Sequence, residues 1–115
     1  MKIVTGIDLV YLPRFKRSAK FGGENFLKRV FHEQEFKHLP SENREHLAGI
    51  FAAKEAVIKA LSLPTDSWHD IKITNIPSGV PKVTVDNQQL TIVHSSLSIS
   101  HDGNYVIAQF VATLK

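Results

Sequence analysis

The sequence predicts a single domain of the α+β class, spanning residues 1–115, from the order of three patterns along the chain. β-Branched and other apolar residues dominate Lys2 to Leu12, which is typical of a strand. Apolar residues then recur at helical spacing as far as Leu61, and beyond Pro64 they alternate with a period of two. We therefore expect an antiparallel sheet packed against a long buried central helix, with short helices beside it.

Residues 47–61 form the predicted central helix, which has no polar face. Ser41 is its expected N-cap, and Pro64 follows its end. Projected at 3.6 residues per turn, one side of this segment is large and apolar, and the other side is small. The small residues are Ala48, Gly49, Ala52, Ala53, Ala56 and Ala60. Such a helix is typically buried on both sides, with another backbone against its small side.

Charged residues interrupt these apolar segments. Lys54, Glu55 and Lys59 lie within the central helix, and a buried charge needs a partner to offset its desolvation. Three interpretations remain open: Glu55 pairs with Lys59 at the i,i+4 spacing, the charges find partners on a neighbouring subunit, or they line a pocket for a metal and an anionic ligand. Asp8 lies within the first strand, either at an exposed sheet edge or in a functional site.

A short basic helix is predicted after the first strand. Pro13 suits its first turn, and Gly22-Gly23 breaks the chain before two short helical segments at 24–30 and 32–39. The basic residues form either a solvated face or a docking site for an acidic partner. They are Arg14, Lys16, Arg17 and Lys20.

Two hairpins are predicted beyond the central helix. The first pairs a strand near Ile71 with a strand near Val83, across the turn Gly79-Val80-Pro81. The second turns at the dipeptide Asp102-Gly103. His101 lies at the end of a strand beside that turn, where a histidine is either structural or catalytic.

Composition narrows the location and the partners of the chain. The absence of cysteine excludes disulfides and thiolate metal sites. No segment reaches the roughly 18 apolar residues of a membrane span, and Asp8 comes too soon for a signal peptide. We therefore expect a cytoplasmic protein with no membrane partner. The net charge of +3 favours an acidic partner. Nucleic acid is not expected, because the basic residues are not interleaved with stacking aromatics.

Three motifs resemble, in order and spacing, the holo-[acyl-carrier-protein] synthases, the small stand-alone members of the 4′-phosphopantetheinyl transferase superfamily. They are Gly6-Ile7-Asp8-Leu9-Val10, Phe51-Ala52-Ala53-Lys54-Glu55-Ala56-Val57-Ile58-Lys59-Ala60 and Leu97-Ser98-Ile99-Ser100-His101. Residues 26–35 and the turn Gly79-Val80-Pro81 also resemble segments of that family. The resemblance thus covers nearly the whole chain and implies the fold of that superfamily.

The resemblance implies an enzyme that moves the phosphopantetheine arm of coenzyme A to a serine of an acyl carrier protein, with Mg²⁺, and releases 3′,5′-ADP. Asp8 and Glu55 would hold the metal, which suits a hard cation that takes carboxylates, waters and phosphate oxygens. Glu55, directly or through water, would accept the serine proton, and Lys59 would balance charge on the leaving phosphate or protonate it. The residues implied in coenzyme A binding are Lys54, Lys59, Gly79, Pro81 and His101.

The resemblance also implies a homotrimer with active sites between subunits, and carrier docking on the basic first helix through Arg14 and Arg17. A role in fatty acid biosynthesis is expected, but fatty-acid, polyketide and peptide carriers present the same serine, so the sequence leaves the carrier open. The alternative is a Mg²⁺-dependent phosphohydrolase acting on a pyrophosphate or nucleotide. One position departs from the family: Ile50 stands where a basic residue is common, so one phosphate ligand is missing or replaced.

Overall fold

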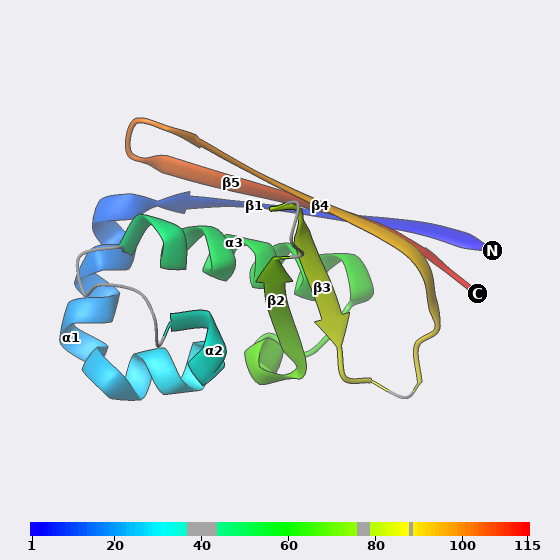
Figure 1. Cartoon of the computed structure of the whole chain (residues 1–115), viewed down its shortest axis with the longest axis horizontal. Helices are drawn as coiled ribbons and strands as arrows, with labels where there is room; N and C mark the ends of the chain where they lie inside the picture. Colours follow the sequence, from blue (N-terminus) through cyan, green and yellow to red (C-terminus); the bar gives the residue numbers. More distant parts are fainter. Residues whose placement is uncertain (37–43, 76–78, 88) are drawn as a thin grey trace.

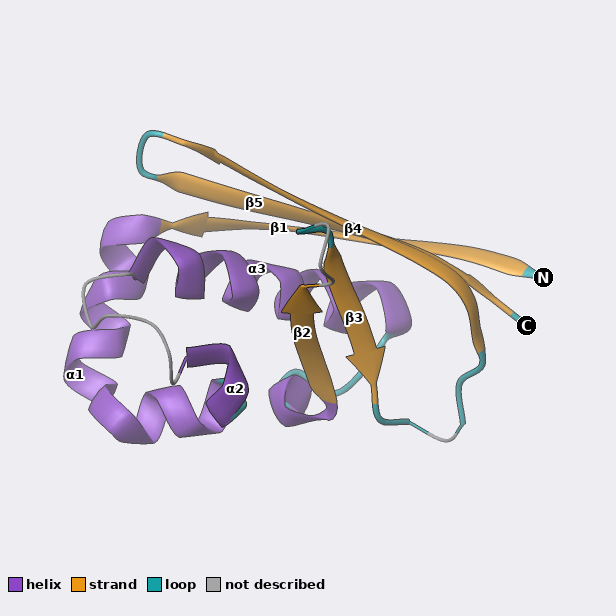
Figure 2. Ribbon diagram, viewed as in Figure 1, coloured by secondary structure: helices purple, strands orange, loops and turns teal. Residues whose placement is uncertain are grey.

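A three-stranded antiparallel sheet lies over a layer of helices in the computed structural model, which describes residues 1–36, 44–75, 79–87 and 89–115 (Figures 1 and 2). The strands are β1 (Lys2–Tyr11), β4 (Ile92–Asp102) and β5 (Tyr105–Leu114), in the order β1-β5-β4. Both pairings are antiparallel. The predicted α+β class is therefore confirmed.

The central helix α3 (Arg44–Leu61) packs against β1 and β5. The predicted contact on its small side is a backbone, that of β1. A Cβ atom built at Gly6 would lie 1.9 Å from the Ala56 carbonyl oxygen and 2.9 Å from the Ala60 nitrogen, so only glycine fits. The helix is thus buried within its own chain, because alanines let the strand approach. The predicted N-cap, Ser41, lies outside the described residues.

Helix α1 (Leu12–Val30) follows β1 and bends at Gly23, which has φ of 57° and ψ of −141°. A residue with a side chain rarely adopts this conformation, so the predicted break at the glycine pair is confirmed. The short helix α2 (Glu33–Phe36) follows. The ring of Phe15 from α1 lies 5.5 Å from that of Phe51, centroid to centroid, which joins the helical layer to α3.

The first predicted hairpin is a separate two-stranded sheet of β2 (Ile71–Asn75) and β3 (Pro81–Val85), entered through the 3₁₀ helix η1 (Ser67–Asp70). The second hairpin is β4 and β5, and β4 begins already at Ile92. Asp102 pairs with Tyr105, so the loop is Gly103-Asn104, one residue later than predicted. Gly103 has φ of 56°, the left-handed conformation that such turns require.

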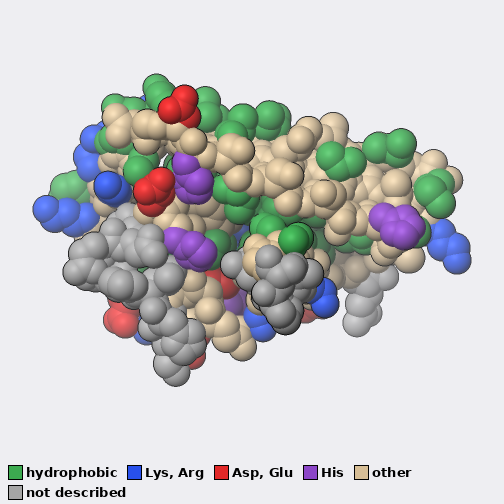
Figure 3. Space-filling view, turned by 45° about the horizontal axis from the view of Figure 1, so that its top comes forward, with side chains coloured by type: hydrophobic (Ala, Val, Ile, Leu, Met, Phe, Trp, Pro, Cys, Tyr) green, Lys and Arg blue, Asp and Glu red, His purple; other side chains and the backbone are tan. Residues whose placement is uncertain are grey.

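One face of the three-stranded sheet packs on α3, and its other face is open to solvent. Side chains of β1 alternate, so that Gly6 and Val10 are buried while Ile3, Ile7 and Leu9 are exposed. Hydrophobic side chains are visible across this side of the molecule in Figure 3. We call the exposed apolar residues of β1 and β5 the outer face: Ile3, Ile7, Leu9, Tyr105 and Ile107. Within the described residues, no helix is long and apolar enough to cross a membrane.

Candidate active site

Asp8 belongs to the edge strand β1 and points toward α3. Lys59 Nζ donates hydrogen bonds to Asp8 Oδ1 and to the Ile7 carbonyl oxygen, both at 3.0 Å. Lys59 therefore pairs with Asp8, and the i,i+4 pairing with Glu55 is wrong. The Asp8 side chain is 15% exposed and that of Lys59 53%. Burial raises the pKa of Asp8 above its ordinary value, while the hydrogen bond and charge of Lys59 oppose the rise.

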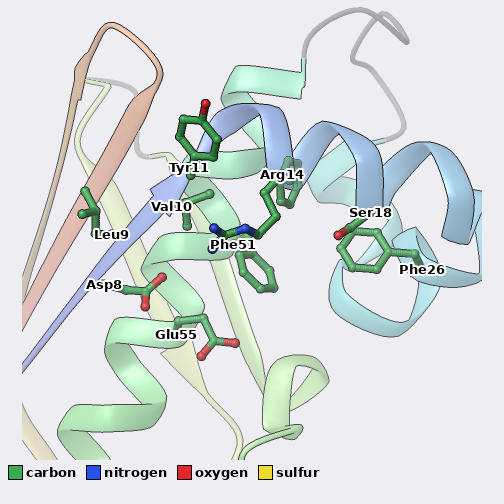
Figure 4. A pocket seen from close by; sticks show the side chains of 10 residues that line it. Asp8, Leu9, Val10, Tyr11, Arg14, Ser18, Phe26, Phe51 and Glu55 are labelled. Carbon is green, nitrogen blue, oxygen red and sulfur yellow. The ribbon is translucent and has the colours of Figure 1, made fainter.

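Glu55 lies one helical turn before Lys59. Its Oε1 accepts a hydrogen bond of 2.8 Å from the Trp68 indole nitrogen of η1. Asp8 and Glu55 line one open cavity of about 340 Å³. The structure thus brings together the two carboxylates that the sequence predicted as a pair, from a strand and a helix 47 residues apart (Figure 4).

Arg14 lines the same cavity, from the first turn of α1. Its guanidinium group lies 5.9 Å from the centre of the Tyr11 ring and points back from α1 toward β1 (Figure 4). Arg17, also predicted for carrier docking, is exposed on α1 and lies outside the cavity lining. The two arginines therefore occupy different environments, one at the cavity and one on the helix surface.

The resemblance implied that Lys54 binds coenzyme A, but its side chain is fully buried. Its Nζ lies 2.7 Å from Glu35 Oε1, and it donates to the carbonyl oxygens of Val30 at 2.7 Å and Trp68 at 3.2 Å. Burial lowers the pKa of Lys54, and the Glu35 carboxylate opposes that shift. An ammonium group with these partners and no exposure cannot contact nucleotide phosphates, so its role is structural.

Gly79, Pro81 and His101 line a second cavity of about 330 Å³. Its lining includes Gly49 of α3 but neither Asp8 nor Glu55. The two cavities share no lining residue. His101 Nδ1 lies 3.2 Å from Glu45 Oε1. The predicted coenzyme A residues are therefore divided. Lys59 adjoins the carboxylates, Lys54 is buried, and Gly79, Pro81 and His101 line the separate second cavity.

Ile50 also lines the second cavity and is only 5% exposed. The same lining includes His46, one turn earlier on α3, and His101. Two imidazoles thus stand around the position where a basic residue was expected.

Sequence reasoning missed Glu35 and Trp68. Glu35 is buried and accepts hydrogen bonds from the backbone nitrogens of His32 and Ile73, at 2.7 and 2.8 Å, besides its contact with Lys54. No spacing pattern marks an acid that pairs across the fold. Trp68 offered one signal, since it is the single tryptophan of the chain.

Two carboxylates and a guanidinium group line an open cavity, and the Lys59 amine pairs with one of those carboxylates. Such a set of charges is typical of enzymes that bind and transfer phosphorylated groups. The chain belongs to the 4′-phosphopantetheinyl transferase superfamily, whose family model matches residues 5–110. The fold and the family predicted from the sequence are thereby confirmed.

Relatives of known name resemble the chain over nearly its whole length. A holo-[acyl-carrier-protein] synthase of Dehalococcoides mccartyi is 41% identical over 117 residues, covering 96% of this chain and 98% of that protein. The synthase of Caldicellulosiruptor saccharolyticus is 41% identical over 116 residues, covering 93% of each.

Solved structures of such synthases resemble the fold of this chain. The Helicobacter pylori holo-[acyl-carrier-protein] synthase in complex with coenzyme A has a TM-score of 0.81 and 32% identity, covering 95% of this chain and 99% of that one. The Chronobacterium ammoniagenes ACPS-CoA complex has a TM-score of 0.85 and 30% identity, covering 100% and 99%.

Proposed function

We propose that the chain is a holo-[acyl-carrier-protein] synthase. It transfers the phosphopantetheine arm of coenzyme A to a serine of an apo acyl carrier protein. The serine oxygen forms a bond to the phosphorus next to the pantetheine arm, and the bond from that phosphorus to 3′,5′-ADP breaks. The observation that carries the proposal is the convergence of Asp8 and Glu55 on one cavity, with Lys59 paired to Asp8. Relatives of that name, some solved with coenzyme A, support it.

Asp8 and Glu55 fit Mg²⁺, because carboxylate oxygens are the donors this hard cation prefers and a metal of this kind keeps several waters. Among the described residues no cluster of three or more acidic, histidine or cysteine side chains occurs, so water and substrate phosphate would complete the shell. Bound there, the cation would neutralise the pyrophosphate of coenzyme A.

Glu55 is the proposed acceptor of the serine proton. One carboxylate oxygen is held by Trp68, and the other remains for the serine hydroxyl or for a bridging water. Lys59 carries the positive charge nearest to Asp8, and its side chain is half exposed, which allows it to reach the leaving phosphate.

The separation of the two cavities supports a homotrimer in which neighbouring chains complete each site. Gly79, Pro81 and His101 would bind the nucleotide end of coenzyme A from one chain, and the carboxylates would act from the next. The outer face supports the same proposal, since an uncovered apolar sheet face, with Leu9 61% exposed, is typical of a surface covered by assembly.

Arg14 and Arg17 are proposed to dock the acidic carrier on α1, in the cytoplasm. Their helix begins directly after β1, so a carrier bound there would present its serine to the cavity of Asp8. A carrier of fatty-acid synthesis is the proposed partner.

Mass spectrometry of apo carriers incubated with coenzyme A and Mg²⁺ tests the function. We expect the carrier to gain the phosphopantetheine mass with wild-type protein and not with Asp8→Ala or Glu55→Ala, while circular dichroism reports that both variants fold. Wild-type transfer by Glu55→Ala would overturn the site. Release of 3′,5′-ADP without any carrier would identify the alternative, a phosphohydrolase.

A further inference from the structure

The indole of Trp68 contacts the active-site carboxylate from outside the cavity. Its nitrogen donates to Glu55 Oε1 at 2.8 Å, yet Trp68 is not among the residues that line the cavity. A hydrogen bond from a rigid ring restrains a glutamate side chain, which otherwise has three rotatable bonds. Oε1 is thereby occupied, and the position of Oε2 is restricted.

The indole is itself held in place by its surroundings. Its ring centre lies 6.2 Å from that of Phe51, and the guanidinium group of Arg29 lies over it at 5.8 Å. The half-buried ring is therefore fixed by packing, as a group that orients another must be.

The backbone of η1 is anchored as well. Lys54 Nζ donates to the Trp68 carbonyl oxygen, and His32 Nε2 donates to the His69 carbonyl oxygen at 2.8 Å. The His69 ring in turn donates to the Lys28 carbonyl oxygen. Three contacts thus tie this four-residue segment to α3, to the end of α1 and to His32 just beyond α1.

We infer that Trp68 is a positioning residue, which aims the Glu55 carboxylate at the cavity for proton transfer and for cation binding. The inference rests on the proposed role of Glu55. It also gives the buried ion pair of Lys54 and Glu35 a function in the site. That pair holds the segment that carries the indole, so it acts on the chemistry through Trp68.

The test begins with Trp68→Phe, which keeps an aromatic ring and removes the N–H donor. We expect about a tenfold loss of kcat, which is equivalent to roughly 1.4 kcal/mol, with KM for the carrier changed less than about twofold. The concentration of Mg²⁺ that gives half of the maximal rate should rise. The matched control is Leu97→Ala in β4, which removes a buried side chain outside both cavities and should keep kcat while it lowers stability.

A second readout does not depend on activity. Trp68 is the single tryptophan, so its fluorescence reports on the indole alone. Titration with Mg²⁺ alone should change the emission of the wild-type protein, because a cation at Glu55 alters the charge on the oxygen that the indole contacts. The Glu55→Ala variant should lose this response.

The outcomes separate this inference from the proposed function. Wild-type kcat in Trp68→Phe, with Glu55→Ala inactive, would overturn the positioning role alone. Equal losses of kcat in Trp68→Phe and Leu97→Ala would also overturn it, since the effect would then be one of stability. An emission that stays unchanged while calorimetry shows that Mg²⁺ is bound would do the same. Transfer by Glu55→Ala would instead overturn the proposed role of Glu55.

Discussion

The two lysines of α3 lie in opposite environments, and we expect Lys54→Met and Lys59→Met to damage different properties. Lys54→Met removes an ammonium group that is 0% exposed and leaves the equally buried Glu35 carboxylate without its countercharge. It also removes the hydrogen bonds that Lys54 donates to the carbonyl oxygens of Val30 and Trp68. Methionine is close in length, so the loss is one of charge and hydrogen bonds more than of volume.

The expected cost of Lys54→Met is large on the scale of the whole fold. Removing one partner of a buried ion pair destabilises by about 3–5 kcal/mol, and a domain of this size is stable by about 5–15 kcal/mol. At roughly 4 °C per kcal/mol, the midpoint of thermal unfolding should fall by about 10–20 °C. Chemical denaturation at one fixed protein concentration measures the free energy of unfolding directly.

Lys59→Met is the control, because Lys59 remains half exposed in its pair with Asp8. A pair of this kind contributes about 0–1 kcal/mol, so stability should be nearly unchanged while transfer falls. A Lys54→Met protein as stable as wild type would refute the reasoning. So would a Lys59→Met variant that lost as much stability as Lys54→Met.

Four further predictions concern the carrier, coenzyme A, assembly and pH. Arg14→Glu should raise KM for the carrier about tenfold and leave KM for coenzyme A unchanged, since it reverses one charge-assisted contact. Steady-state kinetics with each substrate varied measures both constants, and an equal rise in the two would place Arg14 on coenzyme A instead. Ile50→Arg should tighten coenzyme A binding about tenfold in calorimetry, because the new charge faces the cavity of His101. Unchanged binding would mean that another group already holds the coenzyme A phosphate that this arginine was meant to bind. Ile7→Asp on the outer face should convert a trimer to a folded monomer in light scattering, and a persistent trimer would exclude this face as the interface. Asp8→Asn should abolish transfer, yet the variant should unfold at the same or a higher temperature than wild type at pH 7. Burial raises the pKa of Asp8, so the contribution of this carboxyl group to stability is present below about pH 3.8 and is lost as pH rises through its folded-state pKa. A large loss of stability at pH 7 would contradict this.

The sequence predicted which segments are buried better than which side chains meet. The small side of α3 and the alternation in β1 are properties of single segments, so periodicity reveals them. The partner of a charge is set by the fold. Lys54 and Lys59 belong to one motif, yet one pairs with Glu35 in α2 and the other with Asp8 in β1. Trp68 reaches Glu55 across 13 residues that include Pro64, a contact that no spacing rule contains.

The contact between Gly6 and Ala56 has a consequence for motion in the site. Side chains that separate two elements act as compressible spacers, because rotamer changes let the elements drift relative to each other. Here the spacer is absent, and main chain rests on main chain. The backbone at Asp8, two residues further along β1, is therefore fixed relative to the helix that carries Glu55 and Lys59. We therefore expect fluctuation in the site to be confined mainly to the ends of its own side chains.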